Sequence, residues 1–248
     1  MSTLLNIDPT EGHRLEGDGE NPFALSIGDL MAALLLVFIL ALTAALLLIK
    51  EHEEASITLA EEYEALHDSL YKDLMIEFRD DLDDWDAEID SLTLAIRFRE
   101  PEVLFERGES RVKERFVQIL DDFFPRYIEV LRRPRYRDEL VEIRIEGHTS
   151  SEWSVGADEE TAYFENMRLS QDRTRSVLQH CLSTLKSDSV WGWTRNLITA
   201  NGLSSSQPIL NADGTENLRR SRRVEFRVRT DAEAQLSAIL DQVALSRP

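Results

Sequence analysis

The longest apolar stretch of the chain runs from Leu30 to Ile49, 20 residues without a charged side chain. A helix rises about 1.5 Å per residue, so this stretch would be about 30 Å long, which is the thickness of a bilayer's hydrocarbon core. The stretch therefore predicts a transmembrane helix over residues 23–49. It is too long for the apolar part of a signal peptide, lacks a basic n-region before it and has no small-residue cleavage site after it. We expect a single uncleaved span.

A second apolar pattern follows the span. Large apolar residues recur every three or four positions from Leu59 to Ile89, and neither Gly nor Pro occurs between Lys50 and Glu100. This period predicts one amphipathic helix over residues 50–91. Its apolar stripe needs a partner. Self-pairing into a coiled coil is one candidate, although the period drifts from a strict heptad.

Beyond residue 92 the pattern alternates between strand-like and helix-like periods. Residues 139–147 alternate apolar and polar side chains and end at Gly147, which is typical of a strand. Further strands are expected at 92–98, near 195–201 and at 222–228, and helices at 111–131 and 167–185. Strands that alternate with helices predict an α/β sandwich, with helices packed against one sheet.

Charge is spread unevenly over these parts. The formal net charge is -19, and residues 50–91 hold sixteen acidic but only three basic residues, whereas residues 92–248 are nearly balanced. Acidic segments repel nucleic acid and anionic lipid headgroups, so neither is an expected partner of this region. A solvated face of the helix explains the acidic run.

Asp29 lies at the start of the apolar stretch and is the one ionisable residue there. Two interpretations are open. With Ser26 it forms an S-x-x-D pattern, which is typical of a helix N-terminus. Alternatively, it carries ions, because acids inside membrane segments mark ion pathways, and one charge crossing 100 mV is worth roughly 2.3 kcal/mol.

Two other side chains have candidate chemistry. Cys181 is the only cysteine, which excludes an internal disulfide, and its helical spacing with Leu178 and Leu182 indicates a buried thiol. His148 follows the strand at 139–147. We interpret it as a structural hydrogen-bonding residue rather than a metal ligand, since the histidines show no ligand spacing. No metal or cofactor is expected.

Four segments resemble the OmpA-like peptidoglycan-binding domain: IRIEGHTSS (143–151), NMRLSQDRTRSV (166–177), SRRVEFRV (221–228) and VLFERGESRVK (103–113). The resemblance implies an OmpA-like α/β sandwich over 92–230, a mixed sheet with helices packed on one face. In that family an arginine of the LS-x-x-R motif and an aspartate of a GHTD turn hold the carboxylate and amine of a peptide-stem diamino acid. Carried over, the peptidoglycan-binding residues are Arg173, Asn166, Leu169, Ser170, Ser150, Arg222 and Arg223.

The turn departs from the family pattern. Ser150 stands where the family has its aspartate, and an insert over 151–165 follows. Glu152, Asp158 or Glu159 could replace the missing acid, and the sequence does not select one of them.

The order of the parts resembles the B subunit of flagellar-type stators, and IGDLMAALLLVFILAL is similar to that family's span, with Asp29 at the ion-carrying position. Among these relatives the acidic tail, short length and GHTS turn are most similar to the B subunit of Zorya anti-phage systems. The resemblance implies an ion-driven, proton-type motor of the inner membrane. It also implies three partners: a pentameric ring of multi-span A-type subunits, a second copy of this chain, and peptidoglycan.

The resulting organisation has five parts: a flexible acidic cytoplasmic tail (1–22), a transmembrane helix (23–49), an acidic linker helix (50–91), a periplasmic OmpA-like domain (92–230) and a C-terminal helix or tail (231–248). A flagellar stator subunit and a passive tether between membrane and cell wall remain alternatives. An enzyme is not expected, because the sequence has no nucleophile elbow, phosphate-binding glycine loop or metal cluster.

Overall fold

The structure is a computed structural model that describes residues 22–99, 104–106, 108–154, 156–231 and 233. The predicted tail at 1–22 and the predicted C-terminal segment at 231–248 lie almost wholly outside these residues. The chain divides into two compact units, Met1–Ala55 and Ser56–Pro248. Each unit is described by itself.

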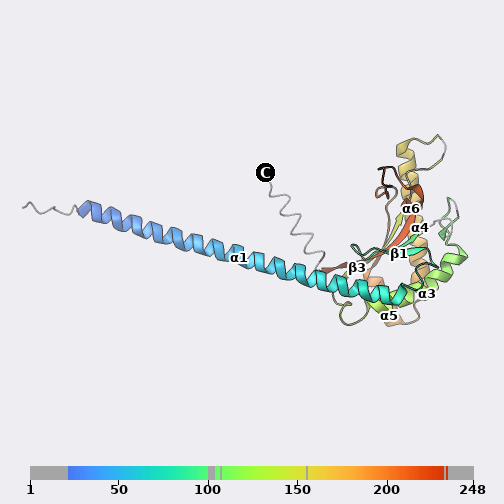
Figure 1. Cartoon of the computed structure of the whole chain (residues 1–248), viewed down its shortest axis with the longest axis horizontal. Helices are drawn as coiled ribbons and strands as arrows, with labels where there is room; N and C mark the ends of the chain where they lie inside the picture. Colours follow the sequence, from blue (N-terminus) through green and yellow to red (C-terminus); the bar gives the residue numbers. More distant parts are fainter. Residues whose placement is uncertain (1–21, 100–103, 107, 155, 232, 234–248) are drawn as a thin grey trace, which may run out of the picture. The chain divides into compact units, whose positions relative to one another are not determined.

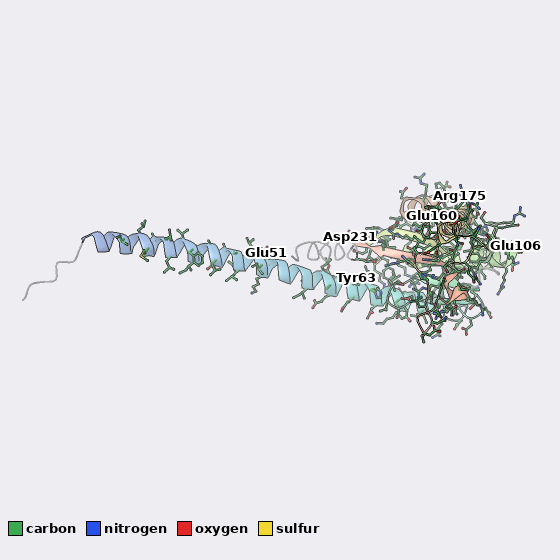
Figure 2. All side chains as sticks on the ribbon, turned by 90° about the horizontal axis from the view of Figure 1, so that it is seen from above. Glu51, Tyr63, Glu106, Glu160, Arg175 and Asp231 are labelled. Atoms are coloured by element: carbon green, nitrogen blue, oxygen red, sulfur yellow. The ribbon has the colours of Figure 1, made fainter. Side chains whose placement is uncertain are left out.

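The first unit contains the apolar part of helix α1 (Pro22–Phe78). Within the described residues, one stretch, Ile27–Glu51, is long and apolar enough to cross a membrane. Its side chains are exposed, and Figure 2 shows side chains projecting from the helix on the N-terminal side of Glu51. The hydroxyl of Thr43 donates to the carbonyl oxygen of Ile39 at 2.7 Å, so this polar group is satisfied within the helix. These features agree with the predicted span.

The second unit is built on a five-stranded mixed sheet with strand order β1-β2-β5-β3-β4. Strands β3 and β4 run parallel, and the other neighbouring pairs run antiparallel. The strands are β1 (Ala87–Ile89), β2 (Ile96–Arg99), β3 (Leu140–His148), β4 (Ile198–Gly202) and β5 (Arg223–Thr230). Strands β3 and β5 lie within two residues of their predicted segments, whereas β4 begins three residues and β2 four residues after the predicted start. Strand β1 was not predicted.

The helices of this unit pack on one face of the sheet (Figure 1). These are α3 (Glu114–Leu131), α4 (Glu159–Thr184) and α5 (Asp188–Leu197), and the single turn α6 (Leu218–Ser221) leads into β5. Side chains alternate across each strand, so one face of β5 presents Val224, Phe226 and Val228 to the core. The opposite face carries arginines and glutamates. The predicted α/β sandwich with helices on one face is confirmed.

The core is aromatic at its centre. The rings of Phe98, Phe123 and Phe226 lie within 6 Å of one another, in edge-to-face contacts. Leu74 and Phe78 of α1 are fully buried in the same cluster. The C-terminal part of the apolar stripe on α1 therefore packs against the α/β domain of the same chain. This packing provides the partner that the stripe requires in that part of the helix.

The predicted helix over 50–91 is wrong beyond Phe78. Arg126 of α3 donates to the carbonyl oxygen of Glu77 at 2.7 Å and pairs with Asp81, and its guanidinium lies over the Phe78 ring. These contacts satisfy the last turn of α1, where carbonyl groups lack helical partners. Asp86 then adopts a left-handed conformation with φ of 47°, and the chain enters β1. The predicted strand at 92–98 begins only at Ile96.

Two helical features differ from the prediction. Helix α4 starts at Glu159 rather than at 167, because the carboxylate of Asp158 accepts a hydrogen bond from the amide of Thr161 at 2.7 Å and caps the helix. Helix α5 was not predicted. It supplies the crossover that a parallel β3–β4 pair requires, together with α4.

Candidate functional site

Arg173 of α4 lies in the interior of the second unit, at 9% exposure. Its guanidinium donates to the carbonyl oxygens of Glu109 at 2.9 Å and Glu106 at 3.2 Å, and it lies 4.8 Å from the centre of the Phe105 ring. The segment predicted as the family's first loop therefore does contact the predicted arginine. These two bonds use two of the five N–H groups of an arginine, which leaves donors for a ligand.

The charge of Arg173 is not balanced by a neighbouring carboxylate. Among the described residues no Asp or Glu side chain lies within ion-pair distance of it, whereas the other buried arginine, Arg223, pairs with Glu225. Burial, followed by repulsion from Arg222, lowers the pKa of Arg173 to about 10. A buried cation that lacks a counterion is unfavourable, and an anion that binds it removes the cost. The site therefore favours a carboxylate or another anion.

Asn166 fixes the turn after β3. Its side-chain amide donates to the carbonyl oxygens of Ser150 and Glu152, both at 3.1 Å, and the side chain is buried. Asn166 and Arg173 are seven residues apart on α4, so they lie on the same face, separated by about 10 Å along the axis. Helix α4 thus joins the turn after β3 to the site of Arg173.

Ser170 and Leu169 are also buried on α4. The Ser170 hydroxyl donates to the Met167 carbonyl at 2.9 Å and accepts from the amide of Ser204 at 3.1 Å. Ser170 lines one small cavity with Arg173, His148 and Arg223. Three of the seven predicted site residues, Ser170, Arg173 and Arg223, therefore line the same cavity, whereas Asn166, Leu169, Ser150 and Arg222 do not line it.

The two arginines of the SRR segment differ. Arg223 is buried, forms a close ion pair with Glu225 and donates to the carbonyl oxygens of Gln207 and Ser221. These contacts hold the strand to the loop before α6. Arg222 is half-buried and close enough to Arg173 to affect its charge. Arg223 therefore has the contacts of a structural residue, whereas Arg222 acts on Arg173 through its charge.

An acid that the sequence did not select approaches the turn. Glu216, in the loop before α6, accepts from the Ser151 hydroxyl at 2.5 Å and from the Ser151 amide at 3.3 Å. Of the three proposed acids, Asp158 is occupied by the cap of α4, and Glu152 and Glu159 are exposed. Glu216 lies 65 residues from Ser151, in a loop without a recognisable motif, so no local pattern points to it.

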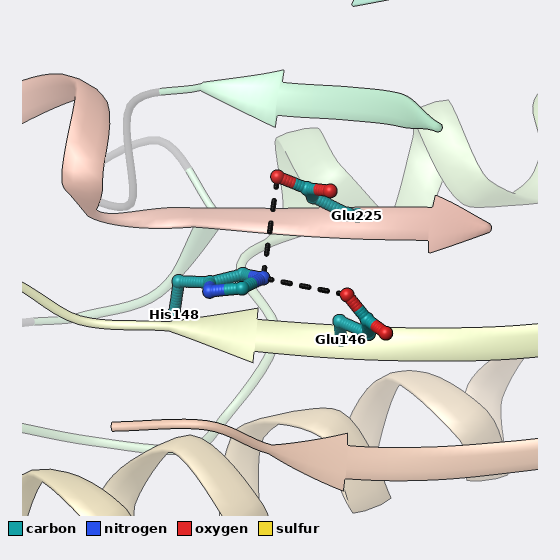
Figure 3. Close-up of side chains that lie close together, drawn as sticks. All are labelled: Glu146, His148 and Glu225. Atoms are coloured by element: carbon teal, nitrogen blue, oxygen red, sulfur yellow. Dashed lines mark ion pairs between the residues drawn. The ribbon is translucent and has the colours of Figure 1, made fainter. Parts of the chain in front are cut away.

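His148 lies between two carboxylates, as Figure 3 shows. Its Nε2 atom is 3.7 Å from Glu146 and 4.0 Å from Glu225, and all three residues are buried. Within the described residues neither ring nitrogen of His148 has a hydrogen-bond partner, so the hydrogen bonds predicted for its side chain are not formed there.

The same three side chains have a ligand set that divalent metals use. However, the Glu225 oxygen that faces the ring is already bound by Arg97 at 3.0 Å and by Arg223. These two guanidinium groups neutralise Glu225 and would repel a cation. The cluster is therefore an ion-pair network on the outer face of the sheet.

Asp29 does not have the position of a helix cap. Helix α1 begins at Pro22, seven residues earlier, so the S-x-x-D interpretation is wrong. Proline suits the first turn because it has no N–H to leave unsatisfied. At Asp29 the amide groups are two turns inside the helix, where they bond to carbonyl groups. The capping role that competed with ion carriage therefore has no structural basis.

Cys181 is fully buried in α4, which confirms the prediction of a buried thiol. Burial raises the pKa of this thiol well above its usual value.

These features define a class: proteins whose described residues include one apolar helix of membrane-spanning length and an α/β domain with a buried arginine that lacks a carboxylate partner. The chain is 43% identical over 225 residues to the Zorya protein ZorB of Escherichia coli (strain ATCC 8739), a match that covers 91% of this chain and 95% of that protein. The chain belongs to the ZorB family of Zorya proteins. No protein-family model matches the sequence.

Solved structures with a similar fold have lower identity. A putative MotB-like protein from Desulfovibrio vulgaris is 24% identical, with a TM-score of 0.49, over 70% of this chain and 96% of that chain. The type VI secretion cell wall anchor from Pseudomonas aeruginosa is 21% identical, with a TM-score of 0.43, over 64% and 97%. The periplasmic domain of Helicobacter pylori MotB is 19% identical, with a TM-score of 0.41, over 65% and 92%.

Proposed function

We propose that this protein is the B subunit of an ion-driven inner-membrane motor that serves anti-phage defence. In this proposal the C-terminal domain lies in the periplasm and anchors the motor to peptidoglycan through Arg173. Asp29 carries ions, with protons as the expected species, through the membrane. Membership of the ZorB family supports the assignment to a Zorya system.

The observation that carries the anchoring function is the charge of Arg173. It is buried, has no carboxylate partner among the described residues and is repelled by Arg222. Peptide stems of peptidoglycan present free carboxylates, and a guanidinium can hold a carboxylate through two parallel charge-assisted bonds. A cell-wall ligand would thus supply the anion that the fold leaves out.

The apolar surface of α1 supports a membrane and protein partners. Side chains from Ile27 to Glu51 are exposed, and a continuous apolar surface of this length is stable only when lipid or protein covers it. A ring of multi-span A-type subunits and a second copy of this chain would surround the helix and face Asp29. A passive tether would need the span but not this carboxylate.

Binding of the purified full chain, in detergent, to isolated peptidoglycan sacculi tests the anchoring function. We expect Arg173→Ala to lose co-sedimentation, and Arg173→Lys to lose most of it, because an ammonium cannot form the paired contacts of a guanidinium. The matched control is Arg175→Ala. Arg175 lies on the same helix, but its side chain is 74% exposed and pairs with Asp172. Equal sedimentation of the wild type and Arg173→Ala would refute the anchor.

A further inference from the structure

A helix begins where β5 ends. The side-chain oxygen of Thr230 accepts a hydrogen bond from the amide of Glu233 at 3.1 Å, and Asp231 and Glu233 have helical backbone conformation. A threonine three residues before a glutamate, with this hydrogen bond, has the pattern of a capping box, which is typical of a helix N-terminus. Because the described residues end at Glu233, the capped turn indicates a helix that continues into residues 234–248.

The sequence of 234–248 has the period of an amphipathic helix. Its large apolar residues follow the spacing i, i+3, i+4 and i+7 at Leu236, Ile239, Leu240 and Val243, and the positions between them hold small or polar residues. A helix of this length is marginally stable in water by itself. Its stability therefore depends on a surface that covers the apolar stripe.

Helix α1 presents an incompletely covered apolar surface in the same compact unit, Ser56–Pro248. Leu70 of its apolar stripe is fully buried by the domain. The preceding large apolar residues of the stripe are only half-buried, and we call them the half-buried stripe: Leu59, Tyr63 and Leu66. Apolar side chains in a row on a helix require a partner.

A cavity of about 60 Å³ connects the half-buried stripe to the capped turn. The residues that α1, β5 and the capped turn contribute to its lining include Tyr63, Leu66, Arg227, Thr230 and Glu233. Glu233 forms an ion pair with Arg227 at 3.1 Å, which fixes the first turn of the new helix beside α1. The cavity is large enough for an apolar side chain.

The register of the new helix brings apolar side chains to this cavity. Residues three and seven positions after Glu233 share its helix face, and these residues are Leu236 and Leu240. One helical turn advances about 5.4 Å, so Leu236 lies within a turn of a residue that already lines the cavity. A second copy of the chain would have to enter the same space beside the capped turn. The geometry therefore favours an occupant from the same chain.

We propose that residues 234–248 form a helix that packs, through Leu236 and Leu240, on the half-buried stripe of α1 in the same chain. This helix completes the cover of the stripe, which the domain begins at Leu70. Between residues 59 and 66 the stripe is then occupied within one chain, and it does not pair with a second copy in a coiled coil.

Hydrogen exchange measured by mass spectrometry on the full chain in detergent tests the packing. The variant L236E/L240E places two charges on the apolar stripe, where burial of unpaired charges is unfavourable. The matched control, Q235E/Q242E, adds the same two charges at polar positions of the segment.

We expect the amides of residues 57–69 to exchange at least about tenfold faster in L236E/L240E than in the wild type, and at the wild-type rate in the control. Equal protection in the wild type and L236E/L240E would overturn the inference. That result would mean that another surface, such as α1 of a second copy, covers the stripe.

Disulfide formation shows which chain supplies the helix. Tyr63→Cys and Leu236→Cys are combined with Cys181→Ala, which leaves no other cysteine in the chain. Mild oxidation should give a disulfide within one chain, seen as a monomer on a non-reducing gel with no thiol left for maleimide. The pair Tyr63→Cys and Gln235→Cys, in the same background, is the control and should keep its thiols. A disulfide-linked dimer, or two free thiols in the Leu236→Cys pair, would contradict packing within the chain.

Discussion

Gly147 of β3 and Gly202 of β4 are register partners in the parallel pair, and both lie directly under α4. A Cβ atom on Gly202 would come within 2.3 Å of the backbone nitrogen of Gln171, and one on Gly147 within 3.0 Å of the carbonyl oxygen of Ser170. The absence of side chains at this pair lets α4 approach the sheet. The approach brings Ser170 and Arg173 to the ends of the strands.

Gly202→Ala should therefore destabilise the domain. The new methyl group meets backbone atoms, which cannot rotate away, and overpacking of this kind costs about 1–3 kcal/mol. Gly192→Ala is the control, because a Cβ atom there meets nothing within 4 Å and lies in helix α5. We expect the control to keep or raise stability by up to about 1 kcal/mol. Chemical denaturation of both variants measures the difference, and equal stabilities would contradict the close approach.

Asp73 attaches α1 to the segment that follows α3. It accepts a hydrogen bond from the Tyr136 hydroxyl at 2.8 Å and forms an ion pair with Arg133 at 2.7 Å. Burial opposes the charge, but these contacts prevail and lower the pKa of Asp73. Asp73→Asn should reduce the free energy of unfolding at pH 7 by about 2 kcal/mol, the scale of hydrogen bonds to a charged group.

The pH dependence of this effect has a defined sign. Because the folded-state pKa of Asp73 is depressed, its stabilisation is present above the unfolded value of about 3.9 and is lost as pH falls through the folded value. The difference in the free energy of unfolding between the wild type and Asp73→Asn should thus become smaller at acidic pH. Asp68→Asn, on an exposed position of the same helix, serves as control. A difference that stays constant down to pH 2 would contradict the ion-pair interpretation.

Cys181 provides a probe of the folded core, because it is the only cysteine in the chain. The thiolate is the reactive form, and burial both raises the thiol's pKa and blocks access. Maleimide should therefore label the folded protein at least about a hundredfold more slowly than the urea-unfolded protein. Rapid labelling of the native chain, measured by mass spectrometry, would show that α4 does not bury this residue.

Local patterns predicted the strands that have one apolar and one charged face. Ile143 and Ile145 alternate with charged residues in β3, and Val224 and Phe226 do so in β5. A period of two is a local property, so the sequence contains it.

The features that the sequence did not predict depend on contacts between residues that lie far apart in the sequence. The spacing of Leu82 and Trp85 continues the helical period beyond Phe78, whereas the helix ends because Arg126 binds Glu77, 49 residues away. Glu216 and Ser151 are 65 residues apart. A local stretch of sequence does not contain both members of either pair. These contacts can therefore be recognised only in the folded structure.

Asp29→Asn should abolish anti-phage protection without reducing the amount of protein in the membrane. The substitution keeps the size and polarity of the side chain but removes its ability to carry a proton or bind a cation. Since the span from Leu30 to Ile49 has no other ionisable residue, no neighbour can replace it. Plaque formation on cells that carry the complete system measures the loss, and membrane fractionation measures the amount of protein.

The control for this experiment is Glu51→Gln, at the opposite end of the apolar helix, which should retain protection because charges there lie in the solvated interface. The same pair of variants separates a motor from a passive tether. A tether requires the span and the Arg173 site but not a charge at Asp29, so it predicts full protection from both variants. Full protection by Asp29→Asn would therefore refute ion carriage and leave the anchor as the function of the chain.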